Sequence, residues 1–180
     1  MSSPQYRINM QKYVFRIHPL NTYQLSFFPN YEVNMYKKLN PMIGDRVYRS
    51  KGLVMHVGVM VDRDLVAHNS PDNNVEVISM EHFSQGKKVE LKRSIGVDPT
   101  ALKAQLQRIS EENRRYCPIS FNCEHFANEL LGTKDGSEQL LAALLVGSFG
   151  LTCKNKWLGL ATAGATGLLL CNGLRKYSTT

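Results

Sequence analysis

The sequence predicts an α+β fold: an antiparallel sheet with a cysteine-bearing helix packed on it, followed by a hydrophobic helical tail. Residues 53–61 alternate between two sets of side chains, which is the period of a β-strand. A capped helix then begins at Asn122 and stops at Gly132, with an apolar face that suits packing on a sheet. Two long uncharged runs after residue 132 predict the tail.

Short strands separated by polar turns account for most of residues 41–91. After the strand at residues 53–61, Asp62 and Arg63 supply a turn into a return strand. The other predicted strands are residues 44–49, 65–68, 75–78 and 88–91, with one helical turn within residues 80–85. Because strands joined by short turns pair in antiparallel fashion, we expect one antiparallel sheet.

A second helix is predicted before the cysteine helix. Asp98 is a suitable N-cap, and Pro99 suits the first helical position. Leu102, Leu106 and Ile109 form one apolar stripe. We therefore expect this helix to pack on the domain through that stripe.

Composition indicates one ordinary core with appendages and excludes several classes of function. The chain has 180 residues, is 43% hydrophobic and carries a formal charge of +7. Its basic residues are scattered without aromatic interleaving, so no specific nucleic-acid partner is expected. The four cysteines have neither metal-type nor disulfide-framework spacing, and we expect no metal or other cofactor. Since the first residues do not have the pattern of a cleavable signal sequence, a reducing intracellular location is expected.

Cys123 stands at the first position of the predicted cysteine helix, directly after its N-cap Asn122. The helix dipole and unpaired backbone N–H groups favour an anion there, so we expect the pKa of the thiol to lie below its ordinary value. With a base nearby, such a cysteine is a nucleophile. The alternative is a small buried apolar side chain, which is the commonest use of a free cysteine.

Two histidines on neighbouring strands are the candidates for that base. Pairing the strands around their shared turn sets His56 directly opposite His68, with Cβ atoms about 5 Å apart. His125 is nearer to Cys123 in the sequence. However, residues two positions apart on a helix lie on different faces, so we do not expect its side chain to meet Cys123. The alternative interpretation of His56 and His68 is a pair of half-exposed sheet residues without chemistry.

Two uncharged runs rich in Leu, Ala and Gly form the tail, at residues 140–151 and 157–174. The second run reaches the length needed to cross a bilayer, about 18 residues, and the first falls short. Three arrangements stay open: a C-terminal anchor, a hairpin that dips into a membrane, and a helix pair packed on the domain. Basic residues that suit anionic headgroups flank the runs: Lys154, Lys156, Arg175 and Lys176. We therefore predict membrane association through residues 140–174.

Three stretches of the sequence together resemble one known family. They are Met55-His56-Val57-Gly58-Val59, then His68, then Asn122-Cys123-Glu124-His125-Phe126. This pattern resembles the lecithin:retinol acyltransferase-like family, the permuted branch of the NlpC-type papain-like superfamily. The similarity covers roughly residues 41–132, with the order His, His, Cys.

The resemblance implies a permuted papain-like fold and a role for each motif residue. Cys123 matches the nucleophile of the family, His56 its general base and His68 the third, polar member of the triad. Family members act on lipid esters as phospholipases A or acyltransferases through a thioester, and many carry a hydrophobic C-terminal anchor. The connection from His68 to Cys123 is shorter than in the vertebrate enzymes, which leaves the substrate and acceptor open, and retinol activity most of all.

The sequence thus predicts a phospholipid acyl hydrolase or acyltransferase at the cytoplasmic face of a membrane, with a phospholipid or other acyl-lipid as substrate. Its expected parts are an N-terminal extension (residues 1–40), a catalytic domain (residues 41–132) and the tail (residues 133–180). Two alternatives stay open. One is a catalytically silent, membrane-anchored interaction or remodelling protein with the same fold, and the other is a peptidase or amidase of the wider superfamily.

Overall fold

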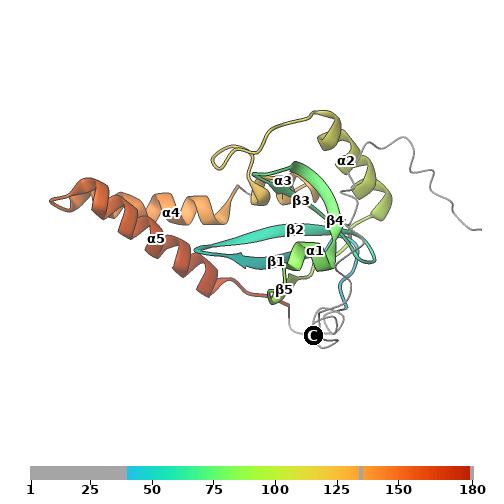
Figure 1. Cartoon of the computed structure of the whole chain (residues 1–180), viewed down its shortest axis with the longest axis horizontal. Coiled ribbons are helices and arrows are strands. Elements are labelled where there is room, and N and C mark those ends of the chain that lie inside the picture. Colours follow the sequence, from blue (N-terminus) through green and yellow to red (C-terminus); the bar gives the residue numbers. More distant parts are fainter. Residues whose placement is uncertain (1–39, 134–135, 179–180) are drawn as a thin grey trace, which may run out of the picture.

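The computed structural model describes residues 40–133 and 136–178 (Figure 1). Its sheet has five strands in the order β4-β3-β2-β1-β5, and every neighbouring pair is antiparallel. The strands are β1 (Arg46–Lys51), β2 (Val54–Asp62), β3 (Leu65–Ser70), β4 (Asn74–Ser79) and β5 (Val89–Lys92). The predicted α+β class and antiparallel sheet are therefore confirmed. Of the expected N-terminal extension, residues 1–39 lie outside the described residues.

The described residues also contain five α-helices and a short 3-10 helix. They are α1 (Met80–Ser84), α2 (Pro99–Glu111), α3 (Cys123–Leu130), α4 (Glu138–Phe149), η4 (Gly150–Thr152) and α5 (Lys156–Leu174). α2 begins as predicted, because the Asp98 side chain accepts from the Thr100 backbone N–H. α3 is followed by Gly132 at φ +67°, the left-handed conformation that glycine tolerates.

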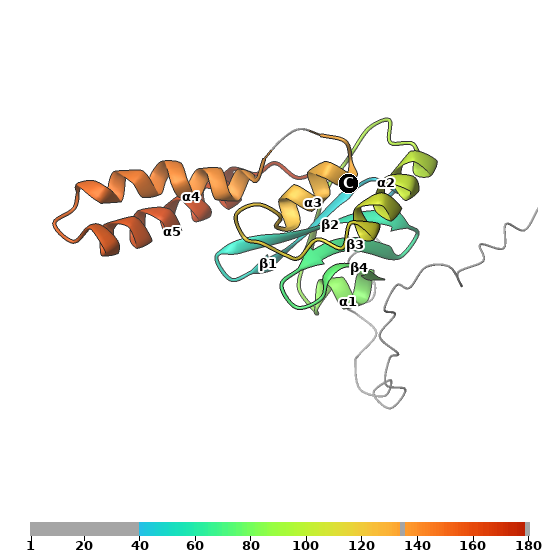
Figure 2. The same ribbon diagram turned by 90° about the horizontal axis from the view of Figure 1, so that it is seen from above.

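Two apolar clusters lie on the two faces of the sheet. α2 and α3 cover one face (Figure 2), where the alternate residues Val57 and Val59 of β2 pack with Leu106 and Phe126. α1 covers the other face through Phe83, which packs with Val47, Met60 and Val66. The cysteine helix therefore packs on the sheet as expected.

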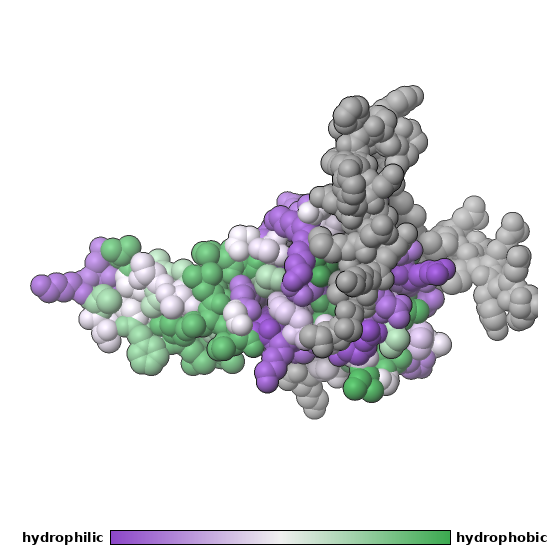
Figure 3. Space-filling model, turned by 90° about the horizontal axis from the view of Figure 1, so that it is seen from below, coloured by the Kyte–Doolittle hydropathy of each residue, from purple (hydrophilic) through white to green (hydrophobic). Residues whose placement is uncertain are grey.

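α4 and α5 form a hairpin that projects away from the sheet (Figures 1 and 2). Glycines let the two helices approach closely, since a Cβ at Gly150 would collide with the Gly159 carbonyl and one at Gly167 with the Ala142 carbonyl. Large apolar side chains face outward: Leu141, Leu144, Leu145, Phe149, Trp157, Leu158, Leu169, Leu170 and Leu174. Figure 3 shows a mainly hydrophobic surface along the hairpin, with hydrophilic residues at its tip.

α5 is long and apolar enough to cross a membrane, judged by length and composition. Only 11% of its apolar 18-residue window is buried inside the protein. An apolar helix that stays so exposed is poorly explained as a core helix of a water-soluble domain. The structure is therefore consistent with membrane association through this segment.

One buried carboxylate joins the base of the hairpin to the sheet domain. Glu124, in the first turn of α3, accepts from Ser137 Oγ at 2.6 Å and from the Gln139 backbone N–H and Nε2, each at 3.0 Å. Arg175, just after α5, donates from Nη2 to Glu124 Oε1 at 2.6 Å. We call Glu124, Ser137, Gln139 and Arg175 the base cluster.

The hairpin is tied to the sheet at two further points. The Gln139 amide bonds both backbone groups of Met55, accepting from its N–H at 2.6 Å and donating to its carbonyl at 2.8 Å. After α5, the Ser178 backbone N–H donates to the Leu91 carbonyl in β5 at 2.7 Å. Both ends of the hairpin are thus fixed to the sheet domain.

Candidate active site

The start of α3 is fixed by a capping box. Asn122 Oδ1 accepts the backbone N–H groups of Glu124 and His125 at 2.9 and 3.1 Å, and His125 Nδ1 accepts the Asn122 N–H at 3.4 Å. The third residue of such a box is usually Glu or Gln, so the histidine gave no signal in the sequence. His125 therefore serves the helix cap, which leaves the base to be found elsewhere.

Cys123 occupies the first helical position and is buried, with 8% of its surface exposed. Burial raises the pKa of its thiol, while the Val57 backbone N–H and those of its own turn act in the opposite direction. The expectation of a lowered pKa is therefore wrong for this closed arrangement, because desolvation outweighs the helix terminus. A neutral thiol needs a base to remove its proton as it attacks.

His56 and His68 come together, although the predicted register is wrong. His56 Nε2 and His68 Nδ1 are 2.8 Å apart, and each side chain is 4% exposed. The direct partner of His68 is Gly58, because the pairing of β2 with β3 shifts between Met60 and Asp62. The rings still meet because diagonal neighbours on one sheet face are within reach of large side chains.

Glu76 extends the histidine pair into a line of three polar side chains. β4 sets it directly opposite His68, with its Oε1 atom 3.2 Å from His68 Nε2. Burial would raise the pKa of Glu76, but His68 and hydrogen bonds from Asn73 and Ser70 lower it overall. Glu76 was not predicted from the sequence, although pairing the strands around residues 70–74 places it opposite His68.

The contacts from Glu76 through His68 to His56 indicate which nitrogen of each histidine ring carries the proton. The nearby Glu76 carboxylate favours a proton on His68 Nε2 electrostatically, although their 3.2 Å contact lacks hydrogen-bond alignment. With that assignment, His68 Nδ1 accepts from His56 Nε2. His56 Nδ1 is then the basic nitrogen of the site. Burial, then the charges of His68, Arg49 and Lys51, lower the pKa of His56 to about 3. The ring is accordingly neutral near pH 7, the form that can accept a proton, but the same burial and charges make it a weak base in this closed arrangement.

Cys123 lies beside the strand that carries His56. Its thiol is close to the backbone N–H of Val57, the residue after His56. Within the described residues, no hydrogen bond joins Cys123 Sγ to a histidine ring. Catalytic hydrogen bonds are often long before substrate binds and tighten in the substrate complex. The structure thus brings His56 and His68 into direct contact, and the strand that carries His56 also passes Cys123. The two rings pack on Phe83 on the α1 face of the sheet, whereas Cys123 belongs to the cluster on the α3 face.

Cys117 is a second, more acidic thiol near the site. Hydrogen bonds from the Ser120 side chain and from the Ser120 and Ile119 backbone lower the pKa of Cys117 to about 7. The segment that carries it is held by a bridge to Phe121, whose carbonyl accepts the Cys117 N–H at 3.2 Å. A water-soluble thiol reagent therefore has Cys117 as a target that competes with Cys123.

Among residues 40–133 and 136–178, no group of three or more His, Cys, Asp or Glu side chains is arranged to hold a metal ion. A scan against protein-family models finds no match, and a search of curated proteins finds none either. The function of the site is accordingly inferred from its residues and their geometry.

Proposed function

We propose that the protein is a thiol-dependent acyl hydrolase or acyltransferase that acts on glycerophospholipids. The observation that carries this proposal is the line from Glu76 through His68 to His56, on a strand whose next residue, Val57, lies against the thiol of a cysteine at a helix N-terminus. The order and spacing of these motifs resemble the lecithin:retinol acyltransferase-like family, with its permuted papain-like fold. The exposed apolar hairpin supports a lipid substrate over a water-soluble one.

In the first step Cys123 Sγ attacks the carbonyl carbon of an acyl ester while His56 Nδ1 takes the thiol proton. The backbone N–H of Cys123 donates to the developing oxyanion. The bond from the carbonyl carbon to the alcohol oxygen then breaks, and His56 gives its proton to that oxygen. A lysophospholipid leaves, and the acyl group stays on Cys123 as a thioester.

In the second step water, an amine or a lipid hydroxyl attacks the thioester carbonyl. His56 takes the proton of the acceptor, the carbon–sulfur bond breaks, and the same proton returns to the Cys123 sulfur. Throughout, His68 and Glu76 keep His56 in the tautomer that leaves Nδ1 basic. The scheme needs no metal or organic cofactor.

We propose further that the α4–α5 hairpin holds the protein on the cytoplasmic face of a membrane. α5 has 19 residues and is about 28 Å long, close to the thickness of a hydrocarbon core, about 30 Å. Because both ends of the hairpin are fixed to the sheet domain, the chain returns to the side from which it enters. These contacts favour a re-entrant hairpin over a single C-terminal anchor, with Lys154 and Lys156 of the tip reaching headgroups.

The surroundings of Cys123 favour a catalytically silent protein instead. Cys123 is buried, its thiol pKa is raised, and it is not hydrogen-bonded to His56 within the described residues. A membrane-anchored interaction or remodelling protein with the same fold has no need of an accessible thiol. This second candidate predicts that the lipid is bound and never cleaved.

Turnover by the full-length protein in mixed detergent micelles tests the proposal. We expect fatty acid release from a glycerophospholipid and no comparable cleavage of a peptide amide. His56→Ala should lower the rate about 10²–10⁴-fold, while His68→Gln should retain part of it by keeping a polar partner. Lack of turnover by folded wild-type protein would favour the silent candidate, and preferential amide cleavage would favour a peptidase.

A further inference from the structure

Arg49 is a buried cation whose donors are not all satisfied. It lies in β1 with 5% of its surface exposed. Within the described residues, its Nε and Nη1 atoms have no hydrogen-bond partner. Arg175 also leaves Nε and Nη1 without a partner, but its charge is paired with Glu124 at 2.6 Å, whereas no salt bridge to Arg49 is formed in the part of the chain that the structure describes. Since burying an unpaired charge is costly, the position of Arg49 requires an explanation.

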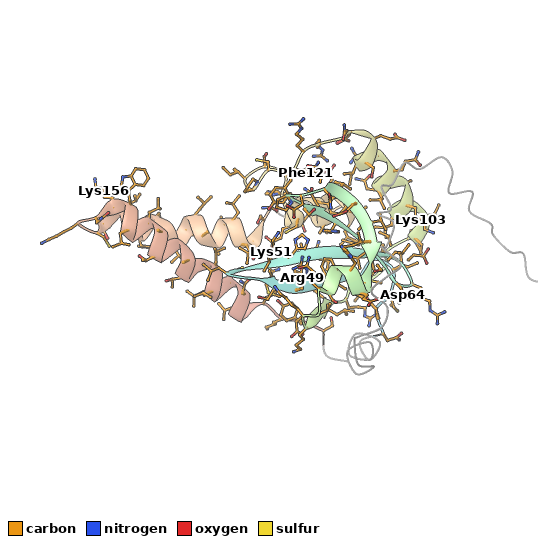
Figure 4. All side chains as sticks on the ribbon, viewed as in Figure 1. Arg49, Lys51, Asp64, Lys103, Phe121 and Lys156 are labelled. Atoms are coloured by element: carbon orange, nitrogen blue, oxygen red, sulfur yellow. The ribbon has the colours of Figure 1, made fainter. Side chains whose placement is uncertain are left out.

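Arg49 belongs to the candidate site by its place in the sheet. Its partner across β1 and β2 is His56, so the two side chains share one face of the sheet. The Cζ atom of Arg49 is 5.6 Å from the centroid of the Phe83 ring, and the His56 ring stacks on that ring at 5.6 Å. Arg49 thus lies inside the sheet domain beside α1 (Figure 4). Its charge lowers the pKa of His56, and burial lowers the pKa of Arg49 itself, an effect that ionisation of Cys123 would oppose.

The contacts of Arg49 do not use its hydrogen-bonding capacity. A cation–π contact with Phe83 offsets part of the cost of burial but leaves N–H donors unsatisfied. Glu76, the acidic member of the site, already contacts His68, Ser70 and Asn73. A guanidinium offers a planar fork of donors that matches a phosphate group.

We infer that Arg49 binds the phosphate group of a glycerophospholipid whose acyl ester lies at Cys123. This inference rests on the proposed function, because it assigns one part of that substrate to a residue of the same site. In such a lipid the glycerol backbone alone separates the phosphate from the esters. Arg49 lies directly across the strand pair from the proposed base His56, so it is well placed for the phosphate. The phosphate oxygens would balance its charge and accept from its unused donors.

Substrate selectivity tests this assignment. The full-length protein is assayed with a short-chain phosphatidylcholine below its critical micelle concentration, and with the diacylglycerol that has the same acyl chains. The ratio of the two kcat/KM values should fall about 10- to 100-fold in Arg49→Gln, because charged hydrogen bonds to the phosphate are lost. Arg49→Lys, which keeps the charge and loses the fork, should fall between wild type and Arg49→Gln.

Lys51→Gln is the matched control for charge. It removes one positive charge from the same strand, near His56, but its side chain is exposed. We expect Lys51→Gln to keep the wild-type ratio. An equal loss on both lipids in Arg49→Gln, with the ratio unchanged, would overturn the assignment and leave Arg49 a structural residue.

Binding to an inactive variant tests the inference apart from the proposed function. In Cys123→Ser, the Arg49 Nε–H resonance is followed by NMR during titration with the short-chain phosphatidylcholine, inorganic phosphate or glycerol. The lipid should shift this resonance and glycerol should not. A lipid that binds without shifting it, or that does not bind at all, would overturn the inference. An equal shift with inorganic phosphate at equal concentration would overturn the lipid assignment in favour of free phosphate.

The two tests can fail separately. A wild-type protein that never cleaves the lipid, while Cys123→Ser binds it through Arg49, refutes the acyl chemistry and keeps the phosphate site. A protein that cleaves both lipids with a ratio insensitive to Arg49→Gln keeps the chemistry and refutes the site.

Discussion

His56 is held neutral by its surroundings, and this neutrality makes the fold sensitive to acid. Burial, then the charges of His68, Arg49 and Lys51, lower its pKa to about 3, whereas a histidine in an unfolded chain titrates near 6.5. Between these values the unfolded chain binds more protons than the folded protein does. Stability is therefore fully present above about pH 6.5 and is lost as the pH falls towards 3.

We predict that His56→Gln flattens this pH dependence. The slope of the free energy of unfolding against pH, between about pH 6.5 and 4, should decrease by up to about 1.4 kcal/mol per pH unit. This value corresponds to one proton that only the unfolded chain binds. Denaturant unfolding in a mild detergent at several pH values measures it. His82→Gln removes an exposed histidine of α1 and is the matched control. Equal changes in both variants would contradict the buried, neutral state of His56.

Glu76 is expected to act through His68 rather than on substrate. In Glu76→Gln the amide can accept from or donate to His68 Nε2, so the tautomer of the pair is no longer dictated. We predict a loss of about 10- to 100-fold in kcat, by analogy with the loss of a carboxylate that orients a histidine in metal sites. KM should change little, and thermal unfolding should show an intact fold. Glu81→Gln, an exposed change on α1, should leave kcat as in wild type.

At the scale of elements, local signals predicted the cysteine helix well. Asn122 caps it and Gly132 follows it in the left-handed conformation, and both roles depend only on neighbouring backbone. The exact partners of the strands were less predictable. The shift between Met60 and Asp62 moves the pairing of β2 and β3, and no local pattern marks such an irregularity.

Contacts between distant parts of the chain were the least predictable. The base cluster joins α3 to both ends of the hairpin. Two of its members, Glu124 and Arg175, are 51 residues apart in the sequence. The sequence indicated an apolar tail but not the buried polar contacts at its base. Arg49 gave no signal either, since its burial depends on the packing of α1 through Phe83.

The base cluster is predicted to stabilise the junction between the sheet domain and the hairpin. Glu124→Gln leaves the Arg175 side chain, which is 2% exposed, without its carboxylate partner. We expect a loss of about 3–5 kcal/mol in the free energy of unfolding, measured in a mild detergent. Glu138→Gln removes the other, 51% exposed partner of Arg175 and should cost less than about 1 kcal/mol. Equal effects of the two variants would contradict the central role of Glu124.

At the scale of the whole molecule, a closed polar site and an exposed apolar hairpin are joined through one junction. Gln139 links the first turn of α4 to Met55, the residue before His56. Glu124, the residue after Cys123, accepts from the Gln139 backbone N–H in the same turn. The position of the hairpin is therefore coupled to the two elements that carry the proposed nucleophile and base.

The outward apolar side chains of the hairpin are predicted to bind lipid. We expect full-length protein to float with anionic vesicles, and the double variant Leu144→Glu, Leu170→Glu to stay in solution with its fold intact. Both side chains are more than half exposed, at 62% and 52%, so the fold does not need them. Ile95→Glu replaces an apolar residue that is 96% exposed away from the hairpin and is the matched control. Flotation of the double variant at the wild-type level would contradict insertion of the hairpin.

The most direct test of the central claim is the search for an acyl group on Cys123. Full-length protein is incubated with a glycerophospholipid that carries a labelled acyl chain, quenched in acid and mapped by mass spectrometry. Cys117→Ser controls for the more acidic thiol nearby, whose pKa is about 7. We predict a thioester on Cys123 in wild type and in Cys117→Ser, and none in Cys123→Ser. Label on Cys117 alone, or a folded wild-type protein without label, would contradict Cys123 as the nucleophile.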